Sequence, residues 1–321
     1  VEDTSFRSHL LQSDDWMRFQ ELLGRQTFQA SGSGWSYSAI LEKSEPFLGK
    51  SSKRLYTPYG PIAGNAESLS QAIISLKKLA VTHKASYVRV EPYPYFDKQV
   101  LKKLSLHKNL RNSQPDLTWV LDLRPSEDEL LMNMTSLNRR VWRRYKEFGL
   151  SFEEDSSAEG QKDFDKLMNT TANRTSSIFH DKDYIAKLLS VFGKSAGIVF
   201  CLHTGKRLAG ALFVDDLRTK TRYYMYACSV EQAKKHSCSS ALLNFLIFNA
   251  KNSGIERFDF FGVSSSSETK HPWAGYSAFK RSFGGSDVRF SGTWELPVKE
   301  LSHSVTRLGR RAIKILKTNR K

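Results

Sequence analysis

The strongest constraint on the fold is an apolar segment in the second half of the chain that leads directly into another. Ser239–Asn252 has an apolar helical pattern, and Gly254 closes this segment. The run Phe258–Phe261 follows almost at once and has the aromatic content of a buried strand. A buried helix that feeds a buried strand needs a sheet beneath it. The pattern therefore predicts a layered architecture of sheet and helices.

The first half of the chain shows the same order of elements. Ser33–Leu41 alternates like a strand, Ser68–Thr82 has helical spacing, and Tyr87–Glu91 alternates again. In the second half, three predicted strands precede the apolar helix: Gly197–His203, Leu208–Val214 and Arg222–Ser229. A chain of 321 residues has room for two domains. We expect two α/β (α+β) domains, each a mixed sheet flanked by helices.

The predicted boundary lies after the strand Leu117–Leu123, which leads out of the first domain. Ser126 then starts one long helix through Phe148, closed by Gly149. We assign residues 1–124 to the first domain and 125–294 to the second. Residues 295–321 complete the first domain through a returning C-terminal helix.

Composition limits the partners. The net charge of +16 indicates polyanions such as RNA, nucleotide diphosphates or anionic lipid. The three cysteines, an odd number, favour a reducing compartment over a disulfide scaffold. The half-motifs Cys201-x-His203 and His236-x-Cys238 lack zinc spacing, so we predict no metal site.

No apolar run approaches the ~20 residues of a membrane span, and no secretory signal is visible, so we expect a cytoplasmic protein.

A set of motifs follows one another along most of the chain. They are Gln12-Ser13 with Trp16, Gly34-Trp35, Tyr56–Pro61, Gln114–Leu123, the basic run Arg139–Arg144, Tyr224–Ala227, Phe279-Lys280 and Phe283-Gly284-Gly285. In this order and spacing the chain resembles the Fem family (FemABX), the aminoacyl-tRNA-dependent transferases that build peptidoglycan side branches. Tyr59 stands where that family usually has arginine. The resemblance implies two domains of the acetyltransferase-like (GNAT) type.

The resemblance also implies a reaction, the aminolysis of an aminoacyl-tRNA ester by an amine of a peptidoglycan stem peptide. Such chemistry needs aligned substrates and a positive group beside the developing oxyanion, and it needs no cofactor. Lys280 occupies the family's Phe-Lys position and is assigned that role. Phe279 is assigned to stacking on the tRNA acceptor end. The alternative is that Lys280 is an ordinary solvated lysine on a helix.

Substrate-binding positions carry over with one departure. Family members use an arginine, followed four residues later by a tyrosine, on the nucleotide diphosphate. Here the matching residues are His180 and Tyr184, which weakens the case for a UDP-linked precursor. Tyr224 and Tyr226 are predicted to share one strand face toward the same groove; a half-buried aromatic sheet face is the alternative. Tyr56 is also assigned to substrate binding.

Two carboxylates are candidate proton acceptors for the attacking ammonium. Glu91 ends a predicted strand, and Glu295 follows Trp294; the family has acidic residues at both places. The alternative for each is a salt bridge at the surface.

Two basic segments are candidate contacts for tRNA or another polyanion. The first comprises Arg139, Arg140, Arg143 and Arg144, whose alternative is a solvated helix face. The second is the C-terminal stretch 301–321, with seven basic and no acidic residues, in which Arg310 and Arg311 are the assigned contacts. This basic face also suits peripheral contact with an anionic membrane.

Three function classes follow from the sequence. The leading one is a monomeric aminoacyltransferase that uses aminoacyl-tRNA and a UDP-linked or lipid-linked peptidoglycan precursor. The second is a GNAT-type acyltransferase that uses an acyl-CoA or other acyl thioester; the glycine-free turn Lys234–Ser240 is unfavourable for its pyrophosphate. The third is a non-catalytic RNA- or membrane-binding protein.

Overall fold

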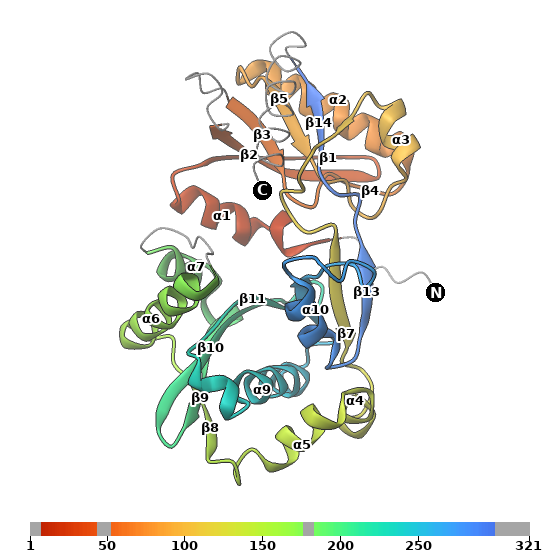
Figure 1. The fold of residues 1–321 in the computed structure, drawn as a ribbon. Helices are drawn as coiled ribbons and strands as arrows, with labels where there is room; N and C mark the ends of the chain where they lie inside the picture. Colours follow the sequence, from red (N-terminus) through yellow and green to blue (C-terminus); the bar gives the residue numbers. More distant parts are fainter. Residues whose placement is uncertain (1–7, 44–52, 176–182, 299–321) are drawn as a thin grey trace, which may run out of the picture. The chain divides into compact units, whose positions relative to one another are not determined.

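The structure is a computed structural model, which describes residues 8–43, 53–175 and 183–298. The chain divides into two compact units (Figure 1). Unit 1 comprises residues 1–116 and 289–321, and unit 2 comprises residues 117–288. Two mixed sheets flanked by helices confirm the predicted fold class.

Unit 1 is built on a sheet whose strands follow the order β1-β2-β3-β5-β14-β6, with β4 paired to β2. Its strands are β1 (Gln26–Gly32), β2 (Trp35–Lys43), β3 (Lys53–Thr57), β4 (Ile62–Ala63), β5 (Tyr87–Val90), β6 (His107–Lys108) and β14 (Trp294–Pro297). Its helices are η2 (Leu10–Gln12), α1 (Asp14–Leu22), α2 (Ala66–Thr82) and α3 (Lys98–Lys103). β3 and β5 run parallel, and β14 is antiparallel to β5.

The core of unit 1 lies between its sheet and α2. Asn65 caps α2 in a capping box with Ser68, and the apolar face behind this cap buries Leu69 and Leu76. These side chains join Trp294 of β14 in one hydrophobic cluster. The last described strand of the chain is therefore an interior part of the first sheet.

Unit 2 contains a seven-stranded sheet in the order β13-β7-β12-β11-β10-β9-β8. Its strands are β7 (Leu117–Asp122), β8 (Leu150–Glu154), β9 (Ala196–His203), β10 (Lys206–Asp216), β11 (Thr221–Ser229), β12 (Arg257–Gly262) and β13 (Ser286–Arg289). Its helices are α4 (Glu127–Asn133), α5 (Ser136–Arg144), α6 (Ala158–Thr175), α7 (Tyr184–Phe192), η3 (Gly193–Ser195), α8 (Gln232–Lys235), α9 (Cys238–Asn252) and α10 (Ala274–Arg281). β12 is parallel to β11 and antiparallel to β7.

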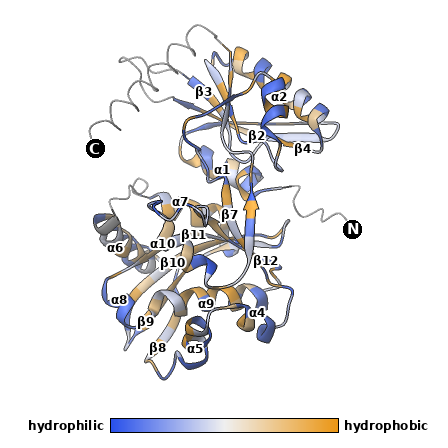
Figure 2. Ribbon diagram, turned by 45° about the vertical axis from the view of Figure 1, so that its right-hand side comes forward, coloured by the Kyte–Doolittle hydropathy of each residue, from blue (hydrophilic) through white to orange (hydrophobic). Residues whose placement is uncertain are grey.

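The predicted apolar helix and strand are α9 and β12, and both lie in the core of unit 2. Arg222 of β11 donates to the Leu246 carbonyl of α9, so that face of the sheet is covered by α9. A Cβ on Gly210 of β10 would lie 3.0 Å from Phe164, so α6 covers the other face. Figure 2 shows hydrophobic residues gathered in the strands and α9, whereas α8 is hydrophilic.

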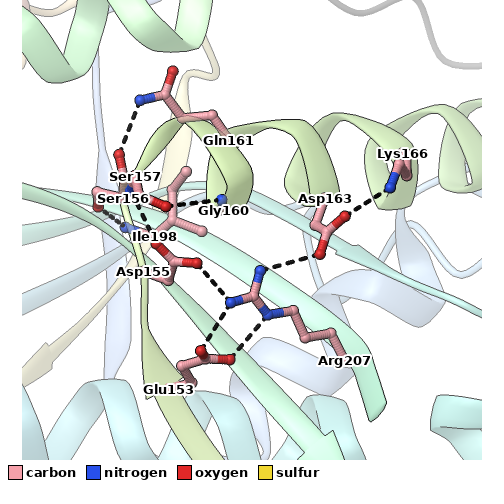
Figure 3. A network of polar contacts seen from close by, with 10 residues as sticks. All are labelled: Glu153, Asp155, Ser156, Ser157, Gly160, Gln161, Asp163, Lys166, Ile198 and Arg207. Carbon is pink, nitrogen blue, oxygen red and sulfur yellow. Dashed lines mark hydrogen bonds and ion pairs between the residues drawn. The ribbon is translucent and has the colours of Figure 1, made fainter.

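Arg207 joins α6 to the edge of the second sheet (Figure 3). Its guanidinium donates to Glu153 at 2.9 Å, to Asp155 at 2.6 Å and to Asp163 of α6 at 3.1 Å. It also lies 4.3 Å from the centroid of the Phe200 ring. One cation is thus shared by three carboxylates, and we call this group the Arg207 network.

Two expectations about the region between the domains were wrong. β7 pairs with β12 in the second sheet, so the strand assigned to the end of the first domain belongs to unit 2. The predicted long helix is two helices, α4 and α5, because Met134 is extended and Arg139 donates to the carbonyl groups of Met132 and Met134 that end α4. Ser126 does cap the first of them, in a capping box with Glu129.

Candidate functional site

Lys280 is the central residue of the candidate site in unit 2. It lies in the last turn of α10, where only 2% of it is exposed. Its Nζ donates to the carbonyl of Gly262, at the end of β12, over 2.8 Å. The same Nζ lies 4.2 Å from the centroid of the Tyr276 ring. Lys280 is therefore a buried, positioned amine and not a solvated helix residue.

Asp259 of β12 is the acidic partner of Lys280. It is buried, and its Oδ1 accepts the N–H of Phe261 at 2.7 Å. Burial raises the pKa of Asp259 to about 7, against the opposing effects of this hydrogen bond and of Lys280. Burial lowers the pKa of Lys280 to about 7, against the attraction of Asp259. The pair therefore titrates near neutrality, where its protonation can respond to a ligand.

Sequence reasoning missed Asp259 and Tyr276. Asp259 stands inside the run Phe258-Asp259-Phe260-Phe261, and a carboxylate within a buried strand is costly unless something compensates it. That signal was present in the sequence. Tyr276 lies four residues before Lys280, the spacing that brings two side chains together on a helix.

Serine contacts fix the position of α10 against the end of β12. Ser277 is fully buried, and its Oγ accepts the N–H of Ser264 at 2.8 Å. Arg281 donates to the Ser264 carbonyl at 2.7 Å. The loop that begins at Ser264 is thus tied to α10 on both sides of Lys280, which keeps the amine in place.

The Phe-Gly-Gly turn after α10 does permit a close backbone approach, as its glycines suggest. A Cβ on Gly285 would lie 2.6 Å from the carbonyl oxygen of Val120, and Gly284 accepts the indole N–H of Trp119. Both glycines have positive φ. The partner of this turn is therefore β7 of the same unit.

Phe279 is half-buried and lies beside the hydrophobic core of unit 2. Its ring meets that of Phe283 edge to face, with centroids 5.3 Å apart. The residue assigned to stacking on RNA therefore already has an aromatic partner inside the protein.

The strand tyrosines do not share a face, so this expectation was wrong. Tyr226 is opposite Leu212 and Tyr224 is opposite Phe213, although Leu212 and Phe213 are consecutive. The pairing leaves Met225 as an extra residue in β11, a bulge that breaks the alternation. Tyr224 packs near Phe258 and belongs to the core cluster with α9. Tyr226 instead contacts Tyr184 of α7.

Tyr184 and Tyr226 form the part of the predicted substrate site that the structure does bring together. Their hydroxyl groups lie 3.3 Å apart and their rings meet edge to face. Burial raises the pKa of Tyr226 well above its ordinary value. Tyr226 is therefore a neutral hydrogen-bonding group at physiological pH. His180, the other residue assigned to the phosphate, lies outside the described residues.

Glu91 is the centre of a buried hydrogen-bond network in unit 1. Its carboxylate accepts from the Tyr56 hydroxyl at 2.9 Å, from Thr293, and from the N–H groups of Tyr59 and Gln114. Burial raises the pKa of Glu91, although all four donors oppose that effect. Four donors occupy both carboxylate oxygens, so these contacts favour a structural role over that of a proton acceptor. Tyr56 belongs to the same network.

Glu295 is held by Arg89 across the strand pair β14–β5. The Nε and Nη2 atoms of Arg89 donate to one carboxylate oxygen of Glu295, at 3.1 and 2.7 Å. Both side chains are largely buried. This arrangement is an ion pair, the alternative considered from the sequence, here inside the protein.

Tyr59, at the family's arginine position, is part of an aromatic cluster in unit 1. Only 1% of it is exposed, and its ring lies 4.0 Å from that of His9 and 4.7 Å from that of Phe290. Its hydroxyl donates to the Pro115 carbonyl at 2.9 Å. The substitution replaces a charged side chain by a packing residue.

The basic helix α5 has two kinds of arginine. Arg139 is partly buried and binds the carbonyl groups that end α4. Arg140, Arg143 and Arg144 are exposed, and Arg144 pairs with Glu147 at 2.6 Å. Arg140 and Arg143 therefore remain the strongest candidates for a polyanion contact on this helix. Arg310 and Arg311, with the predicted C-terminal helix, lie outside the described residues.

The two Cys/His half-motifs meet in the structure. The rings of His203 and His236 stack with centroids 3.7 Å apart, while Cys201 and Cys238 are fully buried. All three cysteines are free thiols, as expected. Within the described ranges, no three His, Cys, Asp or Glu side chains are arranged to hold a metal ion. No helix in these ranges has the length and hydropathy to cross a membrane.

The architecture defines a protein with two GNAT-like units, and solved structures share it. The crystal structure of FemX superposes with a TM-score of 0.78 at 19% identity, covering 94% of this chain and 96% of that one. A tandem GNAT protein from the clavulanic acid biosynthesis pathway gives a TM-score of 0.51 at 12% identity, with 84% and 81% covered. The fold predicted from the sequence is thereby confirmed.

The family follows from the sequence comparison. The model of the FemAB family matches residues 102–206 and 203–310, so the chain belongs to the FemAB family. A lipid II:glycine glycyltransferase of Staphylococcus aureus is 27% identical over 206 residues, which are 58% of this chain and 49% of that protein. The chain thus spans about half the length of this curated relative.

Proposed function

We propose that the protein is an aminoacyltransferase that moves an amino acid from aminoacyl-tRNA to an amine of a peptidoglycan stem peptide. Membership of the FemAB family and similarity to a lipid II:glycine glycyltransferase support this class of reaction. A lipid-linked acceptor is favoured over a UDP-linked one, because His180 replaces the arginine that would bind a nucleotide diphosphate in a fork.

The observation that carries the proposal is the buried amine of Lys280. Aminolysis forms a C–N bond and breaks the ester C–O bond, and negative charge builds up on the carbonyl oxygen between these events. A positioned cation in a poorly hydrated place stabilises that charge far better than one in water. Lys280 is held by the Gly262 carbonyl and the Tyr276 ring. The attraction of Asp259 partly offsets the effect of burial and so favours the protonated, positively charged form of Lys280.

The attacking ammonium loses two protons on its way to the amide. The ribose oxygen of the departing tRNA gains one of them, and the other passes to a base and from there to solvent. Asp259, whose pKa lies at about 7, is protonated in about half of the molecules at neutral pH. Within unit 2, the Lys280–Asp259 pair is therefore suited to exchanging a proton during the reaction.

The proposal is tested by incubating the protein with labelled aminoacyl-tRNAs and either lipid-linked or UDP-linked precursors, followed by mass spectrometry. We expect a mass increment of one amino-acid residue on the precursor, which disappears when the tRNA is digested with ribonuclease beforehand. An increment that requires acyl-CoA and ignores tRNA would replace the proposal by the GNAT-type alternative. Absence of transfer from every aminoacyl-tRNA would leave a non-catalytic role.

A further inference from the structure

Phe261 has a backbone conformation that a strand residue rarely adopts. Its φ is 61°, in the left-handed region that favours glycine. Of the described non-glycine residues with positive φ, Phe261 is the only one inside a strand, β12, and each of the others lies in a turn. Such a conformation persists only where the surroundings hold it, and strained residues of this kind gather at functional sites.

Phe261 belongs to a bulge in β12. Asp259 and Gly262, three residues apart in β12, are opposite two residues of β7 that are only two apart. One residue of β12 is therefore extra, and it lies between Asp259 and Gly262. A bulge bends its strand and redirects the groups that follow it, which here are those of Gly262.

The Gly262 carbonyl points away from β7. The N–H of Val263, which belongs to the same peptide plane, donates to the Leu117 carbonyl of β7 at 3.0 Å. The C=O and N–H of a trans peptide point in opposite directions, so the carbonyl is directed to the other side. On that side, the described pairing of β12 with β11 ends at Asp259, three residues earlier. Lys280 occupies the place of a strand neighbour, because its Nζ donates to this carbonyl at 2.8 Å.

Two contacts hold Phe261 in its conformation. Its N–H donates to Oδ1 of Asp259 at 2.7 Å, and its ring lies 5.6 Å from that of Tyr223 in β11, measured between centroids. Asp259 thus acts on Lys280 in two ways. Its charge attracts the amine, and its hydrogen bond fixes the backbone that leads to Gly262.

We propose that Phe261 is a positioning residue of the candidate site, whose left-handed backbone aims the Gly262 carbonyl at Lys280 and so fixes the amine. This inference rests on the proposed function, because Phe261 would act on the reaction through Lys280. A hydrogen bond to the charged form of an amine favours that form. The carbonyl therefore places the cation and also opposes the effect of burial, which lowers the pKa of Lys280.

The test compares residues at position 261 that differ in how readily they adopt a positive φ. Phe261→Gly removes the ring and keeps the left-handed conformation accessible, whereas Phe261→Ala removes the ring and disfavours that conformation. Phe261→Val disfavours it most, because valine is β-branched. Lys220→Val is the matched control, since Lys220 also has a positive φ but lies in a turn of unit 2 outside the candidate site. Circular dichroism verifies the fold of each variant.

The first measurement is the titration of Lys280 itself, by NMR of protein labelled with ¹³C at the lysine Cε atoms. Lys280→Met identifies the signal. Besides Lys280, the groups that shape this titration are Asp259, the Tyr276 ring, and Arg257 through its effect on Asp259. We expect a midpoint at about 7 for wild type, Phe261→Gly and Lys220→Val. It should be lower by about one unit in Phe261→Val and intermediate in Phe261→Ala.

The second measurement is the rate of transfer at pH 7. A midpoint lower by one unit reduces the charged fraction of Lys280 at this pH from about a half to about a tenth. We therefore expect kcat of Phe261→Val to fall about fivefold, with KM for aminoacyl-tRNA unchanged. Phe261→Gly and Lys220→Val should transfer like wild type.

Three results would overturn the proposal. They are a wild-type midpoint in Phe261→Val, a shift in Phe261→Gly as large as that of the valine variant, and an equal shift in Lys220→Val. If Phe261→Val does not fold, the glycine and alanine variants decide the question, and equal midpoints in these two would count against Phe261.

The titration needs no substrate, so it separates this inference from the proposed function. A shift confined to Phe261→Ala and Phe261→Val, in a protein that transfers no amino acid, would support the positioning role and remove the transferase. Wild-type midpoints in all variants of a protein that does transfer would remove the role of Phe261 and keep the transferase.

Discussion

Unit 2 contains two basic side chains that are held by carboxylates in opposite ways. Arg207 is shared by Glu153, Asp155 and Asp163, partly in contact with water (Figure 3). Lys280 is fully buried and has one acidic neighbour, Asp259, together with a carbonyl and an aromatic ring. The first site has more negative than positive charge, whereas the second has one of each in a poorly hydrated place.

The pKa values of the aspartates shift in opposite directions at the two sites: they are lowered in the Arg207 network, and that of Asp259 is raised. At the Arg207 network, the hydrogen bond from Ser157 and the contact with Arg207 lower the pKa of Asp155, and Lys166 lowers that of Asp163. At the other site, burial moves the pKa values of Lys280 and Asp259 toward each other, to about 7. The Arg207 network keeps its groups charged at neutral pH, which suits a role in stabilising the fold. The Lys280–Asp259 pair can gain or lose a proton at neutral pH, which suits a role in catalysis.

The largest expected effect is that of Lys280→Met on transfer. We expect the rate to fall by about 10²–10³, the typical loss for one oxyanion-stabilising group. The protein should stay folded with a somewhat lower melting temperature, because the buried Asp259 and the Gly262 carbonyl lose their partner. Lys194→Met, at an exposed lysine of the same unit, is the control. Turnover close to wild type in a folded Lys280→Met protein would remove Lys280 from the mechanism.

Arg207→Met should produce the reverse outcome. Removing the shared cation leaves three carboxylates close together, which we expect to destabilise the protein by about 2 kcal/mol. For a unit of this size, that loss corresponds to a melting temperature lower by roughly 4–8 °C. Differential scanning calorimetry measures the shift, with Lys206→Met as the exposed neighbouring control. Transfer by the folded fraction should be unaffected; a hundredfold loss of rate there would contradict the division of roles.

A smaller effect is expected on the pH profile of transfer. If Lys280 acts as a cation, the rate should decline as the pH rises through about 7, because the amine loses its proton. Asp259→Asn removes the attraction that keeps the amine charged, so the decline should move to lower pH, by about one unit. Single-turnover rates across pH 5–9 measure this limb. A limb that moves to higher pH, or a rate that rises through 7, would instead indicate a neutral amine acting as a base.

The smallest effect concerns acid stability. Asp155 and Asp163 have lowered pKa values in the fold, so their contribution is present above the carboxyl pKa of the unfolded chain and is lost as the pH falls below it. Asp259 has a raised pKa and acts in the opposite sense, because the folded protein binds its proton more strongly. Urea titrations between pH 3 and 6 should show a shallower acid loss for Arg207→Met than for wild type. If the free energy of unfolding falls equally steeply with pH in both proteins, Arg207 does not contribute to the loss of stability in acid.

Local pattern predicted the elements of the fold but not their partners. The apolar segments of α9 and β12 and the cap at Ser126 are local features, and each was found where expected. The strand β7 was assigned to the wrong domain because its own sequence does not show that it pairs with the distant β12. The break between α4 and α5 depends on Arg139 reaching back to the end of α4, which helical periodicity does not reveal.

The candidate site was predictable to a similar degree. Lys280 could be selected because of its neighbours in the sequence, but its burial and its contact with Gly262 depend on where α10 packs. Tyr224 and Tyr226 lie on opposite faces because of a bulge at Met225. The residue types around Met225 do not predict this bulge. Glu91 was selected as an acid near the end of a strand, yet its four donors come from segments up to 202 residues away.

The interior place of β14 in the first sheet has a consequence for the order in which the chain is made. Unit 2 is one continuous segment and is complete once residue 288 has been synthesised. The sheet of unit 1 lacks the strand between β5 and β6, and with it Trp294 and Leu296 of the core, until residue 297 has left the ribosome. At about 5–20 residues per second, that wait after residue 116 amounts to roughly 10–35 s. The N-terminal part of this protein therefore emerges first and is completed last.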